Sequence, residues 1–153
     1  MFTYQVWSPV ERTAPPLTSY PTVDMMVTVV QEPLDILKRT LVGCLHQEYP
    51  ADRFRVYVLD DGHRDEVRGL ADELGCVYVR RPNRPLHAKD GNINHAQAQS
   101  NGELLAIFDV DHVPATSFLM ETVGFFHGSA VAFVQTPHHR YNPDIFQQNL
   151  RLS

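Results

Sequence analysis

The sequence predicts an α/β fold in which a mostly parallel sheet carries helices on both faces. Two observations lead to this expectation: short apolar runs rich in β-branched and aromatic residues recur along the chain, and segments with helical periodicity separate them. Because strands that alternate with helices usually lie parallel, the alternation favours a parallel sheet. The chain has 153 residues, 43% of them hydrophobic, which suffices for one domain with a sizeable core.

The predicted strands follow an N-terminal arm. Residues 8–22 are rich in proline, serine and threonine, so we expect residues 1–21 to form an extended arm and residues 22–153 to form the domain. Five apolar runs are expected to be strands, at residues 23–30, 54–59, 76–79, 104–108 and 130–134.

Four helices are expected between or after these strands. The first follows Pro33 and repeats leucine at helical spacing, at positions 34, 37, 41 and 45. The second has its apolar residues at positions 67, 70, 71 and 74 and is expected to stop at Gly75. The third and fourth are expected at residues 93–99 and 117–126.

Composition excludes several classes of protein. The net charge is −5 and there is no basic run, so nucleic acid is not an expected partner. Cys44 and Cys76 lie far apart in the sequence, which indicates neither a zinc site nor a disulfide framework, and both are expected to be buried. The longest apolar stretches are far shorter than the roughly 20 residues that a membrane helix needs, so no membrane span is expected.

Polar residues follow every predicted strand. They are Gln31-Glu32, Asp60-Asp61-Gly62, the loop of residues 80–92, Asp109-Val110-Asp111-His112, and residues 135–139, which include His138 and His139. Because the carboxyl ends of parallel strands meet at one edge, where ligands of such sheets bind, these groups are expected to form one site.

Asp109 and Asp111 form the strongest candidate pair. Side chains two residues apart on a strand share a face, so both carboxylates can bind one Mg²⁺ or Mn²⁺ ion that neutralises a diphosphate leaving group. The alternative is that Asp111 caps the helix near Ser117 while Asp109 hydrogen-bonds within the turn.

Two further groups have both a functional and a structural interpretation. Asp60 and Asp61 are consecutive and point to opposite faces, so one of them is expected to meet a base or a ribose, unless both belong to a plain Asp-Gly turn. The loop of residues 80–92 brings three arginines, a histidine and Lys89 to a helix start, which suits a phosphate; the alternative is a solvated basic loop. His138 and His139 are adjacent and are not expected to share a metal.

Four ordered motifs resemble those of the processive family 2 glycosyltransferases of the cellulose synthase type. They lie at residues 49–62, 87–96, 106–114 and 134–144, so the resemblance covers about residues 21–150. It implies the N-terminal, donor-binding part of a GT-A (Rossmann-like) domain, truncated relative to the whole domain. That domain binds a UDP-sugar, usually UDP-glucose, and adds glucose to a growing β-glucan with inversion.

The resemblance also implies roles for individual residues. The expected substrate-binding residues are Glu32, Asp60, Asp61, Lys89 and Asp109, and the expected ligands of Mg²⁺ or Mn²⁺ are Asp109 and Asp111. The full-length protein is expected to be membrane-embedded, to act at the cytoplasmic face of the inner (plasma) membrane and to take a polysaccharide acceptor. This chain is expected to be soluble and to self-associate through an open sheet edge.

The sequence departs from the family pattern in two places. Residues 28–32 read Thr-Val-Val-Gln-Glu where the family has Pro-Thr-Tyr-Asn-Glu, so the tyrosine expected near uracil is missing. The later Thr-Glu-Asp motif, which brings the general base, and the Gln-x-x-Arg-Trp acceptor motif do not occur in these residues, so no catalytic residue is assigned. A nucleotide-sugar-binding regulatory module without catalysis and a metal-dependent nucleotidyltransferase remain alternatives.

Overall fold

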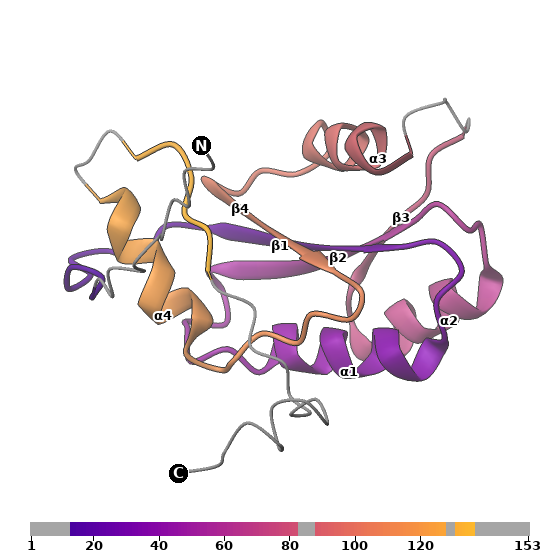
Figure 1. Ribbon diagram of the computed structural model, residues 1–153, viewed down its shortest axis with the longest axis horizontal. Coiled ribbons are helices and arrows are strands. Elements are labelled where there is room, and N and C mark those ends of the chain that lie inside the picture. The colour runs from indigo at the N-terminus through magenta and orange to yellow at the C-terminus, as the bar shows by residue number, and fades with distance from the viewer. Residues whose placement is uncertain (1–12, 83–87, 128–130, 137–153) are drawn as a thin grey trace, which may run out of the picture.

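The computed structural model describes residues 13–82, 88–127 and 131–136, which form a four-stranded sheet with helices packed on it (Figure 1). The sheet order is β3-β2-β1-β4, and its strands are β1 (Val23–Val29), β2 (Phe54–Asp60), β3 (Val77–Val79) and β4 (Leu104–Asp109). All of these neighbouring strands pair in parallel. The predicted α/β class with a mostly parallel sheet is therefore confirmed.

The helices are α1 (Leu34–Leu45), α2 (Asp65–Leu74), α3 (Ala88–Gln97) and α4 (Phe118–Thr122), and the short 3₁₀ helix η1 (Val123–Phe126) continues α4. Helix α1 begins directly after Pro33. Proline is tolerated at a helix start because the first N–H groups of a helix have no partner within it, so a residue without an N–H loses no hydrogen bond there. Helix α2 ends at Gly75, whose φ of 73° lies in the left-handed region that favours glycine.

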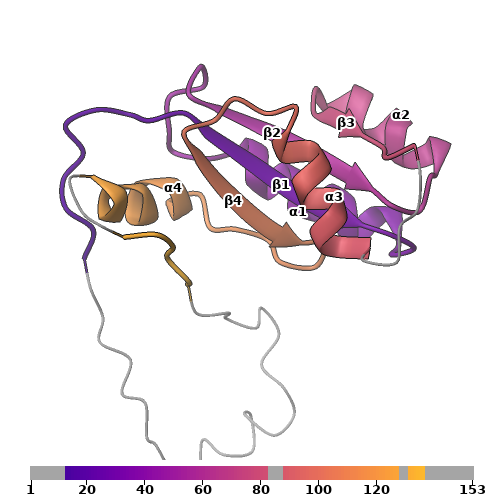
Figure 2. The same ribbon diagram turned by 90° about the horizontal axis from the view of Figure 1, so that it is seen from above.

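The sheet separates two apolar layers. Alternate residues of β1, including Met25 and Val27, pack with α1 and α2, whereas Met26 packs on the other face with Ala96 of α3. Figure 2 shows α3 crossing one face, with α1 on the far side of the sheet. Met25, Met26 and Val27 are fully buried, and burying a side chain of this size stabilises the fold by about 1.5–3 kcal/mol.

The prediction of a fifth strand over residues 130–134 is wrong. Residues 131–136 contain no strand, and Ala130 lies outside the described residues. Phe133 is 78% exposed, so this segment lacks the half-buried packing on a neighbouring strand that gives β-branched and aromatic residues their strand preference.

The third and fourth helices also differ from the prediction, and α3 ends at Gln97 rather than at residue 99. Helix α3 begins at Ala88 rather than at residue 93, because its first turn carries polar and small residues that add nothing to the apolar pattern. The predicted helix over residues 117–126 divides into α4 and η1.

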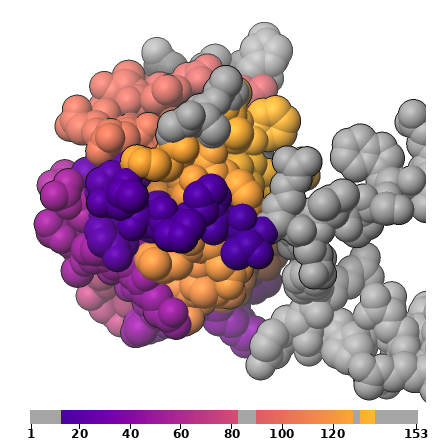
Figure 3. Space-filling view, turned by 90° about the vertical axis from the view of Figure 1, so that its left-hand side faces the viewer, coloured from indigo at the N-terminus to yellow at the C-terminus, as the bar shows by residue number. Residues whose placement is uncertain are grey.

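The described part of the arm, residues 13–21, has no helix or strand and packs against the domain. Figure 3 shows this indigo segment lying against the orange segment that holds α4 and η1. Leu17 packs on the core, the Thr18 hydroxyl lies 2.9 Å from the Nε2 atom of His127, and the Tyr49 hydroxyl donates to the Pro21 carbonyl at 2.8 Å. These contacts fix the chain that leads into β1.

Cys44 and Cys76 are free and buried, as predicted. Burial raises the pKa of the Cys44 thiol to about 12 and that of Cys76 to about 11, so both thiols stay protonated near neutral pH. Among the helices of the described residues, none has the length and apolarity that crossing a membrane requires.

Candidate functional site

A pocket of about 380 Å³ lies at the carboxyl edge of the sheet, which is where parallel sheets bind ligands. Its lining residues are Thr28, Val29, Val30, Glu32, Ile36, Asp61, Asn92, Asp109, Val110 and Asp111. The pocket thus brings together four of the predicted site residues, from the ends of β1, β2 and β4. Asp60 does not line it. Lys89 lies in the first turn of α3, and its side chain lies outside the described residues, as do His138 and His139.

Asp60 is fully buried on the side of the sheet that faces α1 and α2, where all its bonds are internal. Its Oδ1 atom accepts a hydrogen bond from the Gly62 N–H at 2.8 Å, and its Oδ2 atom accepts from the Arg64 N–H at 2.7 Å and from the Tyr78 hydroxyl at 2.8 Å. Burial and the hydrogen bond to Asp60 raise the pKa of Tyr78 to about 12, so the phenol remains a donor. Asp60 therefore fixes the turn into α2.

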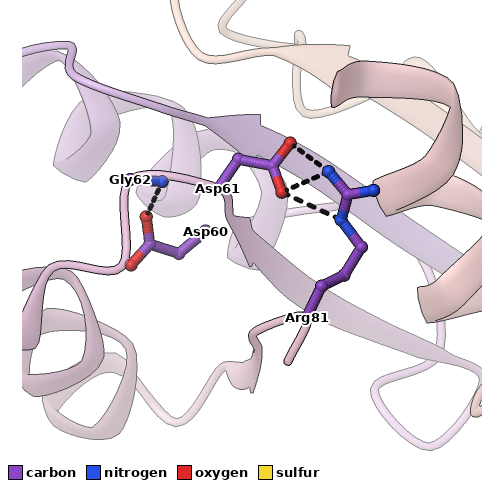
Figure 4. Close-up of polar contacts among 4 residues, drawn as sticks. All are labelled: Asp60, Asp61, Gly62 and Arg81. Atoms are coloured by element: carbon purple, nitrogen blue, oxygen red, sulfur yellow. Dashed lines mark hydrogen bonds and ion pairs between the residues drawn. The ribbon is translucent and has the colours of Figure 1, made fainter. Parts of the chain in front are cut away.

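Asp61 points to the opposite face, as alternation on a strand requires, and pairs with Arg81 (Figure 4). The Arg81 Nη2 atom donates to both carboxylate oxygens of Asp61 at 2.8 and 2.9 Å, and Nε donates to Oδ1 at 3.1 Å. Both residues are buried, with 5% and 4% of their surface exposed. A charge pair with these hydrogen bonds is held in one orientation, so Asp61 presents a fixed carboxylate to the pocket.

Arg81 also lies against the first turn of α3. A Cβ atom added at Gly91 would come within 2.5 Å of the Arg81 Nη1 atom, so only glycine leaves room for the guanidinium there. The ion pair thus connects the end of β2 to α3. In the sequence Arg81 belongs to the basic loop of residues 80–92, and nothing there indicates its carboxylate partner.

Asp109 and Asp111 are much more accessible than the pair after β2. Their side chains are 46% and 68% exposed, and the imidazole of His112 lies between them, with Nδ1 at 3.8 Å from Asp109 and Nε2 at 3.8 Å from Asp111. The proposed helix cap by Asp111 does not form, because α4 has Ser117 at its N-cap position without a side-chain cap. A backbone bond from the His112 N–H to the Asp109 carbonyl at 3.0 Å closes the turn.

The donor set at this turn fits a divalent cation that shares its coordination with a ligand. Carboxylate oxygens are the groups that Mg²⁺ and Mn²⁺ prefer. Within the part of the chain that the structure describes, no three carboxylate, histidine or cysteine side chains are arranged as a complete metal site. Two exposed carboxylates leave further coordination positions for water or for the oxygens of a bound molecule.

The Glu32 side chain binds the backbone directly after β1. Its Oε2 atom accepts hydrogen bonds from the backbone N–H groups of Val30 at 2.7 Å and Gln31 at 3.0 Å, while Arg64 donates to the Glu32 carbonyl at 2.9 Å. Partial burial alone would raise the pKa of Glu32, but these backbone donors and the charge of Arg64 outweigh it and lower the pKa. The ionised carboxylate therefore organises the loop beside the pocket.

Asn92, for which the sequence predicted no role, lies in the pocket wall. Asn92 is 1% exposed, and its buried Oδ1 atom has no hydrogen-bond partner among the described residues. Buried amide groups are normally paired, so this atom fits a polar ligand group. The signal was helical spacing: Asn92 precedes the buried Ala96 by four residues and so shares its inward face.

The described lining residues of the pocket include no aromatic side chain. At the position where the family pattern has tyrosine, Val30 is 40% exposed and lines the pocket together with Ile36. An apolar ligand group here meets aliphatic surface, which lacks the additional attraction of ring stacking.

Comparison with protein families gives a match to glycosyl transferase family 2 over residues 25–152. The chain is 41% identical over 152 residues to cellulose synthase 1 of Komagataeibacter xylinus, covering 96% of this chain and 10% of the relative. It is 40% identical over 152 residues to the UDP-forming cellulose synthase catalytic subunit of Xanthomonas axonopodis pv. citri, covering 21% of that protein. The chain therefore spans between a tenth and about a fifth of these relatives.

Two solved structures are similar to this fold. A mannosyltransferase of Pyrobaculum calidifontis, in complex with GDP-Man and Mn²⁺, has a TM-score of 0.66 and 28% identity over 78% of this chain and 36% of its own. Glucosyl-3-phosphoglycerate synthase of Mycobacterium tuberculosis, in complex with Mn²⁺, UDP and glucosyl-3-phosphoglycerate, has a TM-score of 0.56 and 20% identity over 72% of this chain and 41% of its own. The second likeness extends to the fold alone.

Proposed function

The chain belongs to glycosyl transferase family 2, and from this membership we propose that it forms the donor-binding part of an inverting β-glycosyltransferase that uses UDP-glucose. One observation carries the proposal: the pocket joins an exposed Asp-x-Asp pair, Asp109 and Asp111, to a buried, fixed carboxylate, Asp61. The relatives of known name are cellulose synthases, which supports glucose as the sugar and a β-glucan as the acceptor. For the full-length protein we propose action at the cytoplasmic face of the plasma membrane.

The two ends of the pocket suit two parts of the donor. Asp109 and Asp111 would hold Mg²⁺ or Mn²⁺, the divalent cations that carboxylate oxygens suit. When bound, the metal acts as a Lewis acid that neutralises the diphosphate. Lys89, in the first turn of α3, is proposed to reach the same diphosphate, because anions are favoured at a helix N-terminus.

The nucleoside is proposed to lie at the other end. Asp61 and the unpaired Oδ1 atom of Asn92 are acceptors, which suit the hydroxyl groups of ribose and the N–H of a base. Val30 and Ile36 supply the apolar contact for the base. Asp60 is proposed to contribute through the turn that it fixes, since its carboxylate bonds elsewhere.

The negative charge of the pocket lining leads us to expect that UDP binding depends on a metal ion. Glu32, Asp61, Asp109 and Asp111 all line the pocket, so four carboxylates surround the space proposed for the donor. A diphosphate brought among these carboxylates is repelled unless a cation intervenes. UDP should therefore bind far more tightly with Mn²⁺ than without it.

Isothermal titration of the chain with UDP, UDP-glucose, GDP and GDP-mannose, each with and without Mn²⁺, tests the proposal. We expect UDP and UDP-glucose to bind only in the presence of metal and the guanosine compounds to bind more weakly. No general base of the Thr-Glu-Asp type occurs in these residues, so the chain is expected to bind donor without polymerising it. Metal-independent binding, or an alkali-insoluble β-glucan made by the chain alone, would contradict the proposal.

We also propose self-association through β4. Among the described residues β4 pairs with β1 alone, and Ile107 on this strand is 49% exposed. An open strand edge with apolar side chains is a site for pairing between chains. Light scattering at high concentration should give a mass above that of one chain, and a sharp monomer would contradict it.

A further inference from the structure

Helix α1 packs against the segment that carries Asp109 and Asp111, the proposed metal ligands. Thr40 lies on the inner face of α1 and is completely buried, and its hydroxyl donates a hydrogen bond to the carbonyl of Val110. Val110 is the residue between Asp109 and Asp111, so this bond fixes the peptide that links the two carboxylates.

A second set of bonds ties the rest of the same loop to the end of α1. The Gln47 Nε2 atom donates to the Ala115 carbonyl at 2.9 Å, and its Oε1 atom accepts from the Leu119 N–H at 3.2 Å. The Glu48 N–H donates to the Thr116 carbonyl at 2.8 Å. Figure 1 shows this loop running back along α1 from the end of β4 to α4.

The helix and the loop are also in close contact at Gly43. A Cβ atom added at Gly43 would lie 2.7 Å from the Val113 Cγ1 atom and 3.2 Å from the Pro114 Cδ atom. Glycine at this position lets the loop pack directly on α1. Of these contacts, the Thr40 bond is the one closest in sequence to the carboxylates.

Two exposed carboxylates bind a cation well only if their backbone is already ordered. Otherwise binding must restrict the backbone as well as the side chains, and affinity falls. On the basis of the proposed function, we propose that Thr40 is a positioning residue for the metal site: its buried hydroxyl sets the orientation of Asp109 and Asp111 through the Val110 carbonyl.

The test compares two threonine hydroxyls that are both buried. Thr40→Val removes the bond to Val110 with little change in volume. Thr122→Val is the matched control, because the Thr122 hydroxyl donates to the Phe118 carbonyl within α4 at 2.7 Å and Thr122 does not line the pocket. Thr40→Ser keeps the hydroxyl and is expected to restore the wild-type behaviour. If Thr40→Val does not fold, Thr40→Ala carries the same expectation.

Two readouts are measured for each folded variant: broadening of the Asp109–Asp111 backbone amide signals by Mn²⁺ alone, and UDP affinity with Mn²⁺. We expect Thr40→Val to weaken both about three- to tenfold, the range for one lost hydrogen bond, and Thr122→Val to change neither. Equal values for Thr40→Val and wild type, with only the melting temperature lowered, would overturn the inference. A wild type that binds Mn²⁺ but no UDP would overturn the proposed function while the Mn²⁺ readout still decides the role of Thr40.

Discussion

Two aspartate pairs at the same edge of the sheet have opposite surroundings. After β2, Asp60 and Asp61 are buried, and their oxygens already accept hydrogen bonds from Tyr78, Arg81 and backbone N–H groups. After β4, Asp109 and Asp111 are exposed and have the His112 ring at 3.8 Å.

The difference shows what a carboxylate at a strand end can do. A buried carboxylate with fixed donors has one orientation, which suits the folding of a turn or the recognition of a particular hydroxyl or N–H group. An exposed pair with open coordination positions suits a cation that arrives with its ligand. We therefore expect substitutions after β2 to change stability and substitutions after β4 to change metal binding.

Arg81→Met should give the largest loss of stability. It leaves the Asp61 carboxylate buried without its cation, which typically lowers the free energy of unfolding by about 3–5 kcal/mol. Urea denaturation followed by circular dichroism measures the effect. Arg39→Met is the control, because Arg39 pairs with Asp35 at 3.8 Å on the surface and its side chain is 75% exposed. Equal losses for the two variants would contradict the difference in burial.

Asp60→Asn should have the next largest effect. The asparagine amide keeps one acceptor oxygen but replaces the other with an NH₂ group, which cannot accept the hydrogen bonds made to that oxygen. The free energy of unfolding should therefore fall by about 2–3 kcal/mol. Asp52→Asn, with a side chain 81% exposed, should be nearly neutral in the same urea experiment. An Asp60→Asn variant with normal stability and impaired UDP binding would place Asp60 in the pocket instead.

Tyr78→Phe should lower the free energy of unfolding by about 1 kcal/mol, because it removes one donor from Asp60. The raised pKa of Tyr78, about 12, means that its neutral form stabilises the folded state. This contribution is complete below the ordinary tyrosine pKa of about 10 and declines as the pH rises towards 12. The stability difference between wild type and Tyr78→Phe should therefore shrink over that range, and a difference that grows would have the wrong sign.

Asp109→Asn and Asp111→Asn should have the smallest effect on stability. The Asp109 side chain is about half exposed and the Asp111 side chain is mostly exposed, so the free energy of unfolding should change by no more than about 0.5 kcal/mol. Urea denaturation without metal is the measurement. A loss above about 2 kcal/mol in either variant would show that this pair, like the pair after β2, serves the fold.

The sequence predicted the parts of the fold that depend on local pattern. Apolar runs rich in β-branched and aromatic residues located the four strands, and helical spacing followed by glycine located the end of α2 at Gly75. Alternation on a strand already required Asp60 and Asp61 to face opposite ways. It did not indicate which aspartate faces the pocket, because that depends on the register of β2 against β1. The partners Arg81 of Asp61 and Thr40 of Val110 lie 20 and 70 residues away, so only the folded chain brings them together.

The wrong prediction of a strand at residues 130–134 has the same cause, because contacts between distant residues cannot be read from the sequence. Val131 and Phe133 have high strand preference, but that preference is realised only on a neighbouring strand, and in this structure Phe133 remains exposed. Asn92 was overlooked because the third helix was predicted to begin at residue 93, one position after it, whereas α3 begins at Ala88 and places Asn92 one turn before Ala96. Its burial against the pocket follows from the packing of α3 on the sheet.

Calorimetric titration of UDP into wild type, Asp109→Asn and Asp111→Asn, with and without Mn²⁺, tests whether these two carboxylates bind the metal that holds UDP. We expect wild type to bind UDP only with Mn²⁺ and each variant, still folded, to lose at least tenfold of that affinity, the effect of about 1.4 kcal/mol. Metal-dependent binding that is unchanged in both variants would contradict this expectation.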